Sequence, residues 1–110
     1  PAPTVNPLQE AQDFFNSKIE SQVIQSRCIT CHLSGGLAAS SGITYLPASD
    51  IRHFTNNFTV LRNAGKSYGR TGLLSRSMGL NGHQGGAQFS STNEQAYKDL
   101  DTMLQMMEKL

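Results

Sequence analysis

The sequence predicts an all-α fold, with three main helices joined by long glycine-rich loops. Three segments place apolar residues three and four positions apart, which is the spacing of one helix face. No segment alternates apolar and polar residues as a half-buried strand does. The segments between the expected helices are rich in Gly and Ser, which favour irregular backbone. With 110 residues, the chain is the size of one domain.

The first expected helix covers residues 8–24 and leads into a pair of cysteines. Its apolar residues form one helix face: Leu8, Ala11, Phe14, Phe15, Ile19, Val23 and Ile24. Residues 1–7 hold three of the four prolines and have no apolar period, which predicts an extended linker. We therefore expect a linker at 1–7 and one monomeric domain at 8–110, which belongs to a longer multi-domain protein.

The second expected helix follows Ser49 or Asp50, because either side chain can accept hydrogen bonds from a helix N-terminus. Before it, the Gly and Ser content of residues 33–42 predicts a loop. The apolar face of the helix is Ile51, Phe54, Phe58 and Leu61. Residues 63–65, Asn-Ala-Gly, are suited to ending it.

The final expected helix follows residues 91–94, whose Ser-Thr-Asn-Glu order is that of a capping box. Between the second helix and this one, the frequent glycines of residues 65–91 predict loop, with a short helical turn at 72–78. The final helix has one apolar face: Tyr97, Leu100, Leu104 and Met107. Met103, Met106 and Met107 recur at helical spacing, which favours a place in the core.

The composition argues against two kinds of partner and favours a cofactor. A formal net charge of +1, with 15% charged residues, gives no field that would attract nucleic acid or an anionic membrane. No run approaches the roughly 20 apolar residues that a membrane-spanning helix needs. Hydrophobic residues make up only 37% of the chain and Trp is absent, so apolar side chains are sparse for an all-protein interior. A large apolar cofactor would fill that gap.

The motif Cys28-Ile29-Thr30-Cys31-His32 predicts the identity of this cofactor. In C-x-x-C-H, two cysteines three positions apart reach the two vinyl groups of a haem and form thioether bonds. The adjacent histidine then lies beneath the iron. We therefore expect one covalent haem c, attached at Cys28 and Cys31, with His32 as an axial ligand of the iron.

Three other interpretations of the two cysteines are weaker. A thioredoxin-like dithiol follows a buried strand and begins a helix, whereas residues 25–27 end a helix. A zinc site needs two further ligands at close spacing, and His53 and His83 lie far apart without a second cysteine pair. A structural disulfide across two intervening residues would close a tight, strained loop.

An electron carrier needs a second axial ligand, because an unchanged coordination shell moves little on oxidation or reduction. Methionine and histidine are the usual ligands, and a thioether raises the potential. His83 lies among glycines, which let backbone approach a flat cofactor closely. Met78 lies in a Ser-rich, Gly-flanked segment. We favour His83 and keep Met78 as the alternative, with His53 expected on the exposed face of the second helix.

The arrangement of Phe14-Phe15, the motif at 28–32 and a terminal amphipathic helix resembles small mono-haem cytochrome c domains over nearly the whole chain. A narrower pattern resembles cytochrome c-like modules of large secreted bacterial proteins: Gly72-Leu73-Leu74, Gly82-His83-Gln84-Gly85-Gly86, Phe89 and Tyr97. His83 matches the histidine of that pattern. The sequence departs from the common small cytochromes because Met78 is not followed by a proline-rich ligand loop.

The resemblance implies a cytochrome c-like fold and a single-electron carrier that is not an enzyme. Because bacteria attach c-type haem outside the cytoplasm, the resemblance also implies a periplasmic, secreted or cell-surface location. It implies redox proteins as partners. In some polysaccharide-degrading bacteria, similar modules lie beside carbohydrate-binding domains and are proposed to pass electrons to lytic polysaccharide monooxygenases. The alternative function is a haem enzyme or gas sensor, peroxidase-like, with an open or displaceable sixth position.

The two haem propionates would need donors, and arginine can clamp a carboxylate through two hydrogen bonds. Several basic residues lie in the segment expected to surround the cofactor. Among them we expect Arg52 or Arg70 to bind the propionates.

Overall fold

The first helix of the computed structural model begins at a capped asparagine; the structure describes residues 6–34, 36, 41–80, 83 and 86–110. Asn6 Oδ1 accepts the backbone N–H groups of Leu8 and Gln9, at 3.0 and 3.2 Å. Pro7 takes the first helical position, where no backbone donor is needed. Helix α1 spans Pro7–Phe14, so it includes the last residue of the expected linker, of which residues 1–5 lie outside the described part.

The chain continues without a break into η1 (Phe15–Cys28), in which backbone hydrogen bonds join residues five apart. The expected helix therefore exists and extends to Cys28, but its second half has a wider turn than an α-helix. The segment from Phe15 to Cys28 makes about three full turns, at roughly 4.4 residues per turn. The same segment as an α-helix would make about 3.6 turns. The wider turn thus keeps Cys28 on the side of the helix that buries Phe15, Ile19 and Val23.

Helix α2 spans His53–Ser77 and is kinked at Gly69, whose φ of 76° and ψ of 159° are not helical. The expected end at 63–65 is wrong, because Ala64 is buried in a helix that continues to the kink. Glycine permits the positive φ at residue 69, so the chain turns there and resumes as the short helical stretch expected at 72–78. Ile51 was expected on the apolar face, but it precedes the helix and is 95% exposed.

Helix α3 spans Gln95–Glu108, as the sequence predicts. The expected capping box does not form, because Glu94 is itself the N-cap and its side chain makes no capping hydrogen bond to the helix. Its carboxylate instead accepts the backbone N–H of Ser90, at 2.8 Å. The expected apolar face is mostly buried, and Met103 is fully buried while Met106 packs against the core. The methionines of this helix therefore belong to the core, as their spacing indicates.

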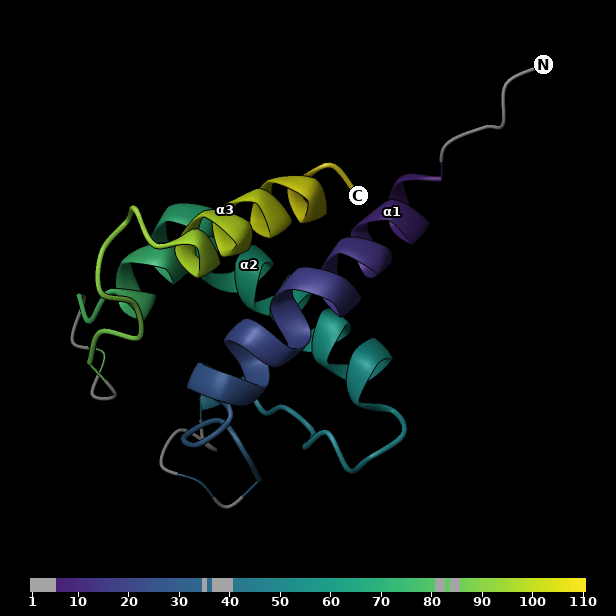
Figure 1. The fold of residues 1–110 in the computed structure, drawn as a ribbon, viewed down its shortest axis with the longest axis horizontal. Helices are drawn as coiled ribbons and strands as arrows, with labels where there is room; N and C mark the ends of the chain where they lie inside the picture. The colour runs from purple at the N-terminus through teal and green to yellow at the C-terminus, as the bar shows by residue number, and fades with distance from the viewer. Residues whose placement is uncertain (1–5, 35, 37–40, 81–82, 84–85) are drawn as a thin grey trace.

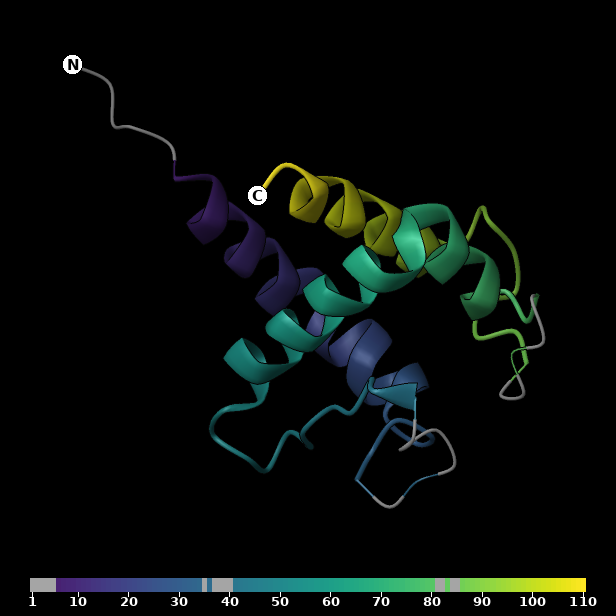
Figure 2. The ribbon, with the colours of Figure 1, turned by 180° about the vertical axis from the view of Figure 1, so that it is seen from behind.

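The three helical segments cross one another around a single core (Figure 1). Helix α3 packs against both α2 and η1, and α2 also contacts η1. Figure 2 shows the reverse view, in which the irregular segment after η1 runs along the bottom of the molecule and the one after α2 lies at its right. The radius of gyration is 13.8 Å, close to the roughly 13 Å of a compact domain of this length.

Within the described ranges the fold is all-α, as expected, and β-structure is limited to two isolated bridges. One bridge is parallel and joins Leu33 to Tyr45, and the other is antiparallel and joins Met78 to Ala87. Each bridge fastens one of the irregular segments that contain the candidate histidines. Among the described residues, no helix combines the length and hydropathy that crossing a membrane requires.

Candidate functional site around His32 and His83

His32 is fixed by hydrogen bonds on both its backbone and its ring. Its backbone N–H donates to Cys28 O at 3.1 Å, and its carbonyl accepts the N–H of Tyr45 at 2.7 Å. Nδ1 of the ring lies 2.8 Å from the carbonyl oxygen of Ile43. A carbonyl can only accept, so Nδ1 is the protonated nitrogen, and Nε2 of the neutral ring has the free lone pair.

His83 is held in the same way by a separate loop. Its Nδ1 donates to the carbonyl oxygen of Gly86 at 3.1 Å, which again leaves the lone pair on Nε2. The loop is closed by the bridge between Met78 and Ala87 and by a 2.7 Å hydrogen bond from Gln88 N–H to Ser77 O. Of the glycines expected to let backbone approach a cofactor, residues 82 and 85 lie outside the described part of the chain, and Gly86 supplies the carbonyl that holds His83.

Gly79 makes the closure of this loop possible. Its φ is +82°, a conformation that side chains rarely adopt. A Cβ at this position would also lie 2.8 Å from the backbone nitrogen of Ala87. The glycine therefore permits the close approach of the two ends of the loop that presents His83.

The two loops bring the rings of His32 and His83 together. The ring centroids are 6.4 Å apart, and the ring planes differ by only 10°. Tyr45 lies on another side of His32, with its ring edge-on at 6.1 Å. Two near-parallel imidazoles, each with Nδ1 occupied by a carbonyl, are thus the central feature of the site.

Both cysteines of the motif are free thiols in this structure. Cys28 packs against the hydrophobic core, and burial of its thiol raises the pKa to about 12, although the neighbouring Arg27 partly opposes this. A redox dithiol depends on a cysteine with a lowered pKa, so the environment of Cys28 argues against the thioredoxin-like interpretation.

Met78, the alternative ligand, lies at the C-terminal end of α2. Its backbone N–H donates to Leu74 O and Ser75 O, and its side chain is partly buried against the core. The role of Met78 that the structure describes is therefore to pack and to close the loop of His83.

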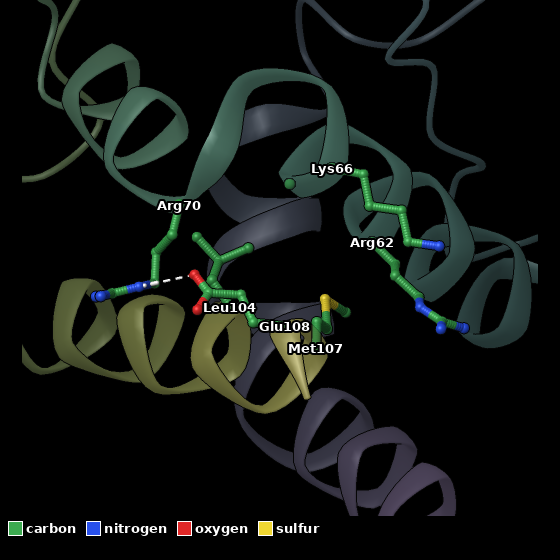
Figure 3. A pocket seen from close by; sticks show the side chains of 7 residues that line it. Arg62, Lys66, Arg70, Leu104, Met107 and Glu108 are labelled. Atoms are coloured by element: carbon green, nitrogen blue, oxygen red, sulfur yellow. Dashed lines mark hydrogen bonds and ion pairs between the residues drawn. The ribbon is translucent and has the colours of Figure 1, made fainter. Parts of the chain in front are cut away.

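The two arginines expected at the propionates both have carboxylate partners. Arg52 is exposed and pairs with Asp50 at 2.8 Å. Arg70 pairs with Asp101 at 2.7 Å and with Glu108 at 3.0 Å. Figure 3 shows the Arg70–Glu108 pair in a cavity of about 220 Å³ between α2 and α3. To bind a propionate, either arginine would have to share or exchange these partners.

His53 was expected to be solvated, and this is wrong. Its side chain is 13% exposed, and its Nδ1 lies 2.7 Å from a carboxylate oxygen of Glu20, which is itself only 2% exposed. The same carboxylate accepts the side-chain amides of Gln25 and Asn57, at 2.7 and 3.2 Å. The periodicity of the second helix could not reveal this contact, because the buried carboxylate of Glu20 lies on a different helix.

Arg27 makes contacts close to the site that nothing in the sequence predicted. Its guanidinium donates to the carbonyl oxygen of Gln88 at 2.8 Å, forms an ion pair with Glu94, and lies 4.8 Å from the centre of the Phe89 ring. These partners follow the His83 loop in the chain, whereas Arg27 directly precedes the cysteine motif. The only sequence signal is the position of a basic residue beside Cys28.

Neither a cluster of metal-binding side chains within the described ranges nor a match to a known protein identifies the site. Among the described residues, no three His, Cys, Asp or Glu side chains gather closely enough to hold a bare metal ion. Two imidazoles and two thiols are instead a donor set that fits a haem. No protein-family model, curated protein or solved structure matches the chain.

Proposed function

We propose that this protein is a single-electron carrier with one c-type haem, attached at Cys28 and Cys31 and bound through His32 and His83. The observation that supports this most is the pairing of two near-parallel imidazole rings from segments distant in the chain. Only one of these histidines belongs to the C-x-x-C-H motif, so the second provides an independent reason for the proposal.

The distance between the rings fits an iron between them. Imidazole nitrogens bind transition metals at about 2 Å, so an iron between two Nε2 atoms separates the ring centroids by roughly 6 Å. The observed separation is 6.4 Å. Directly packed aromatic rings have centroids about 4.5–7 Å apart. The spacing therefore fits two ligands of a shared atom, and spectra of the haem-loaded protein distinguish that arrangement from a directly packed pair.

The residues around the rings prepare them for this role. The carbonyls of Ile43 and Gly86 hold the Nδ1 protons, which fixes both rings in the tautomer whose Nε2 can bind a metal. The haem supplies reversible one-electron oxidation and reduction of its iron. With His32 and His83 as its two protein ligands, the haem would keep its coordination during transfer, and its potential would be lower than with a methionine ligand.

Apolar side chains near the histidines also favour a flat apolar cofactor. Leu33 follows His32 directly and is 37% exposed, and Leu80, in the His83 loop, is 59% exposed. Contiguous apolar surface marks a binding site, whereas single exposed leucines are common, so these two side chains count only together with the paired rings beside them. A haem between the loops would cover such side chains, with Arg52 or Arg70 as propionate partners after exchange of their carboxylates.

The proposal includes a cytochrome c-like module of a longer protein outside the cytoplasm. Its partners would be redox proteins, and the module resemblance favours an extracellular oxidoreductase such as a lytic polysaccharide monooxygenase in polysaccharide degradation. The alternative, a haem enzyme or gas sensor, is favoured by one feature. The hydrogen bonds of His83 to Leu80 and Gly86 are local to its own loop, which would let the ligand leave.

The decisive experiment is the visible and EPR spectrum of the protein produced with a cytochrome c maturation system. We expect a low-spin ferric haem without the weak red band of sulfur bound to iron. The near-parallel rings predict a rhombic EPR signal, because both imidazoles interact with the same iron d orbital. Met78→Leu, the matched control, should leave both spectra unchanged.

The other outcomes contradict the proposal in distinct ways. A colourless protein would exclude the haem. If the wild-type protein shows the red band of a sulfur ligand and Met78→Leu loses it, then Met78 rather than His83 is the ligand. A high-spin spectrum with rapid binding of carbon monoxide would move the function to a haem enzyme or sensor.

A further inference from the structure

We propose that Arg27 is a positioning residue that holds the His83 loop against the haem-attachment motif and so keeps His83 opposite His32. This inference rests on the proposed function and adds to it a residue outside the C-x-x-C-H motif. It assigns Arg27 an effect on the occupancy of the sixth position, without contact to the iron.

Arg27 makes three kinds of contact with the segment after the His83 loop. Its guanidinium donates to Gln88 O at 2.8 Å and forms an ion pair with Glu94. It also lies over the Phe89 ring, 4.8 Å from the ring centre. Hydrogen bonds between charged groups are roughly twice as strong as neutral ones, so these contacts form one rigid attachment.

Each partner of Arg27 is fixed in turn. Phe89 is buried in the core and stands edge-on to Tyr97 at 5.6 Å. Glu94 also accepts the N–H and the hydroxyl of Ser90, at 2.8 and 3.0 Å. The ion pair with Arg27 and the hydrogen bonds from Ser90 lower the pKa of Glu94 to about 2, so Glu94 remains charged at neutral pH.

The attachment connects directly to both histidines through the backbone. On one side, Arg27 precedes Cys28, whose carbonyl accepts the N–H of His32. On the other side, Gln88 donates its N–H to Ser77 and thereby closes the loop that presents His83. Few residues therefore separate the guanidinium from each ligand, and a shift at Arg27 changes the distance between the two rings.

The planar guanidinium suits this position better than an ammonium group. Arginine donates in several fixed directions, so one side chain reaches a carbonyl and a carboxylate while stacking on a ring. Its Nε also donates to Gln22 O at 3.2 Å, which fixes the side chain against η1. Lysine can keep the charge at this position, but it cannot reproduce all of these contacts.

The test compares four variants of the haem-loaded protein: Arg27→Gln, Arg27→Lys, Glu94→Gln and Arg62→Gln. Arg62→Gln is the matched control, because it removes the same side chain from α2, where Arg62 donates to the carbonyl oxygen of Leu110 at 3.4 Å. Two readouts are measured: the spin state of the ferric haem and the rate at which carbon monoxide binds the ferrous haem. Carbon monoxide must displace His83, so its rate reports how firmly the ligand is held.

We expect Arg27→Gln and Glu94→Gln to raise the rate of carbon monoxide binding about tenfold and to add a high-spin fraction. Arg27→Lys should restore part of the wild-type behaviour, and Arg62→Gln should leave the rate and the spin state unchanged. An Arg27→Gln protein that keeps the wild-type rate and spin state would overturn the positioning role and leave the haem proposal intact. A wild-type protein without a low-spin haem would instead overturn both.

Discussion

The three histidines of this chain occupy two contrasting environments. His53 is enclosed between η1 and α2, where its Nδ1 meets the buried carboxylate of Glu20 at 2.7 Å. His32 and His83 lie in irregular segments, where backbone carbonyls take their Nδ1 protons and their rings face one another. The first histidine is part of a buried polar network, whereas the other two form a pair of near-parallel rings, each with Nδ1 bound to a backbone carbonyl.

The contrast lies in burial and in the neighbouring ring rather than in the partner of Nδ1 alone, because metal-binding histidines donate Nδ1–H to carboxylates as well as to carbonyls. A carboxylate partner joins His53 to an acidic group that is also satisfied by Gln25 and Asn57, so the cluster stabilises the contact between two helices. A carbonyl partner fixes the tautomer without introducing a nearby charge, which suits a ligand of a metal. The following predictions test this distinction.

The largest expected effect is the loss of the cofactor when both thiols are removed. Cys28→Ser combined with Cys31→Ser eliminates the atoms that form thioether bonds, although His32 and His83 remain. Acid-acetone extraction should then release all haem from the polypeptide, whereas the wild-type protein should keep it. Each single variant should keep at most one thioether, as mass spectrometry can check. Haem that stays with the double variant after extraction would contradict covalent attachment through these cysteines.

The next effect separates the ligand histidine from the structural one. His83→Ala should convert the low-spin ferric haem to a high-spin form, because the sixth position loses its ligand. His53→Ala is the matched control and should keep the low-spin spectrum. The measurement is visible absorption of both ferric variants at neutral pH. A low-spin spectrum in His83→Ala, or a high-spin one in His53→Ala, would reverse the roles assigned to the two residues.

A smaller effect concerns stability, for which the cluster around His53 matters more than the pair of His32 and His83. His53→Ala leaves the buried Glu20 carboxylate without one of its donors, so the free energy of unfolding should fall by about 1–3 kcal/mol. Urea denaturation of the haem-loaded protein measures this change. Asn57→Ala, which removes another donor to Glu20, should have a comparable effect. Stability equal to wild type in both variants would show that the network is not needed to hold η1 against α2.

The smallest effect is a pH dependence at the ion pair of Arg27. The pKa of Glu94 is lowered from 4.5 to about 2, so the pair stabilises the folded state fully above about pH 4.5 and loses this contribution as the pH falls toward 2. The melting temperature of Glu94→Gln should therefore lie below that of wild type at pH 6, and the difference should shrink on acidification. A difference that grows toward pH 2 would contradict the direction of the shift.

Several features of the fold could be predicted because they depend on neighbouring residues. Apolar spacing indicated the first and last helices, although α3 begins at Gln95, three residues after the start that a capping box at Ser91–Glu94 implies. The end of the second helix could not be predicted, since an Asn-Ala-Gly sequence ends a helix only when packing permits. Ala64 is buried, and the chain turns at Gly69 instead.

The sequence by itself determined the cysteine motif, the adjacent His32 and the all-α class, because each is a pattern of residues close together in the chain. The tertiary structure decided which other histidine lies beside His32, and which partners Arg27 meets. It also decided that η1 has a wide turn with Cys28 against the core. These features depend on contacts between distant segments, and local periodicity contains no information about which segments pack together.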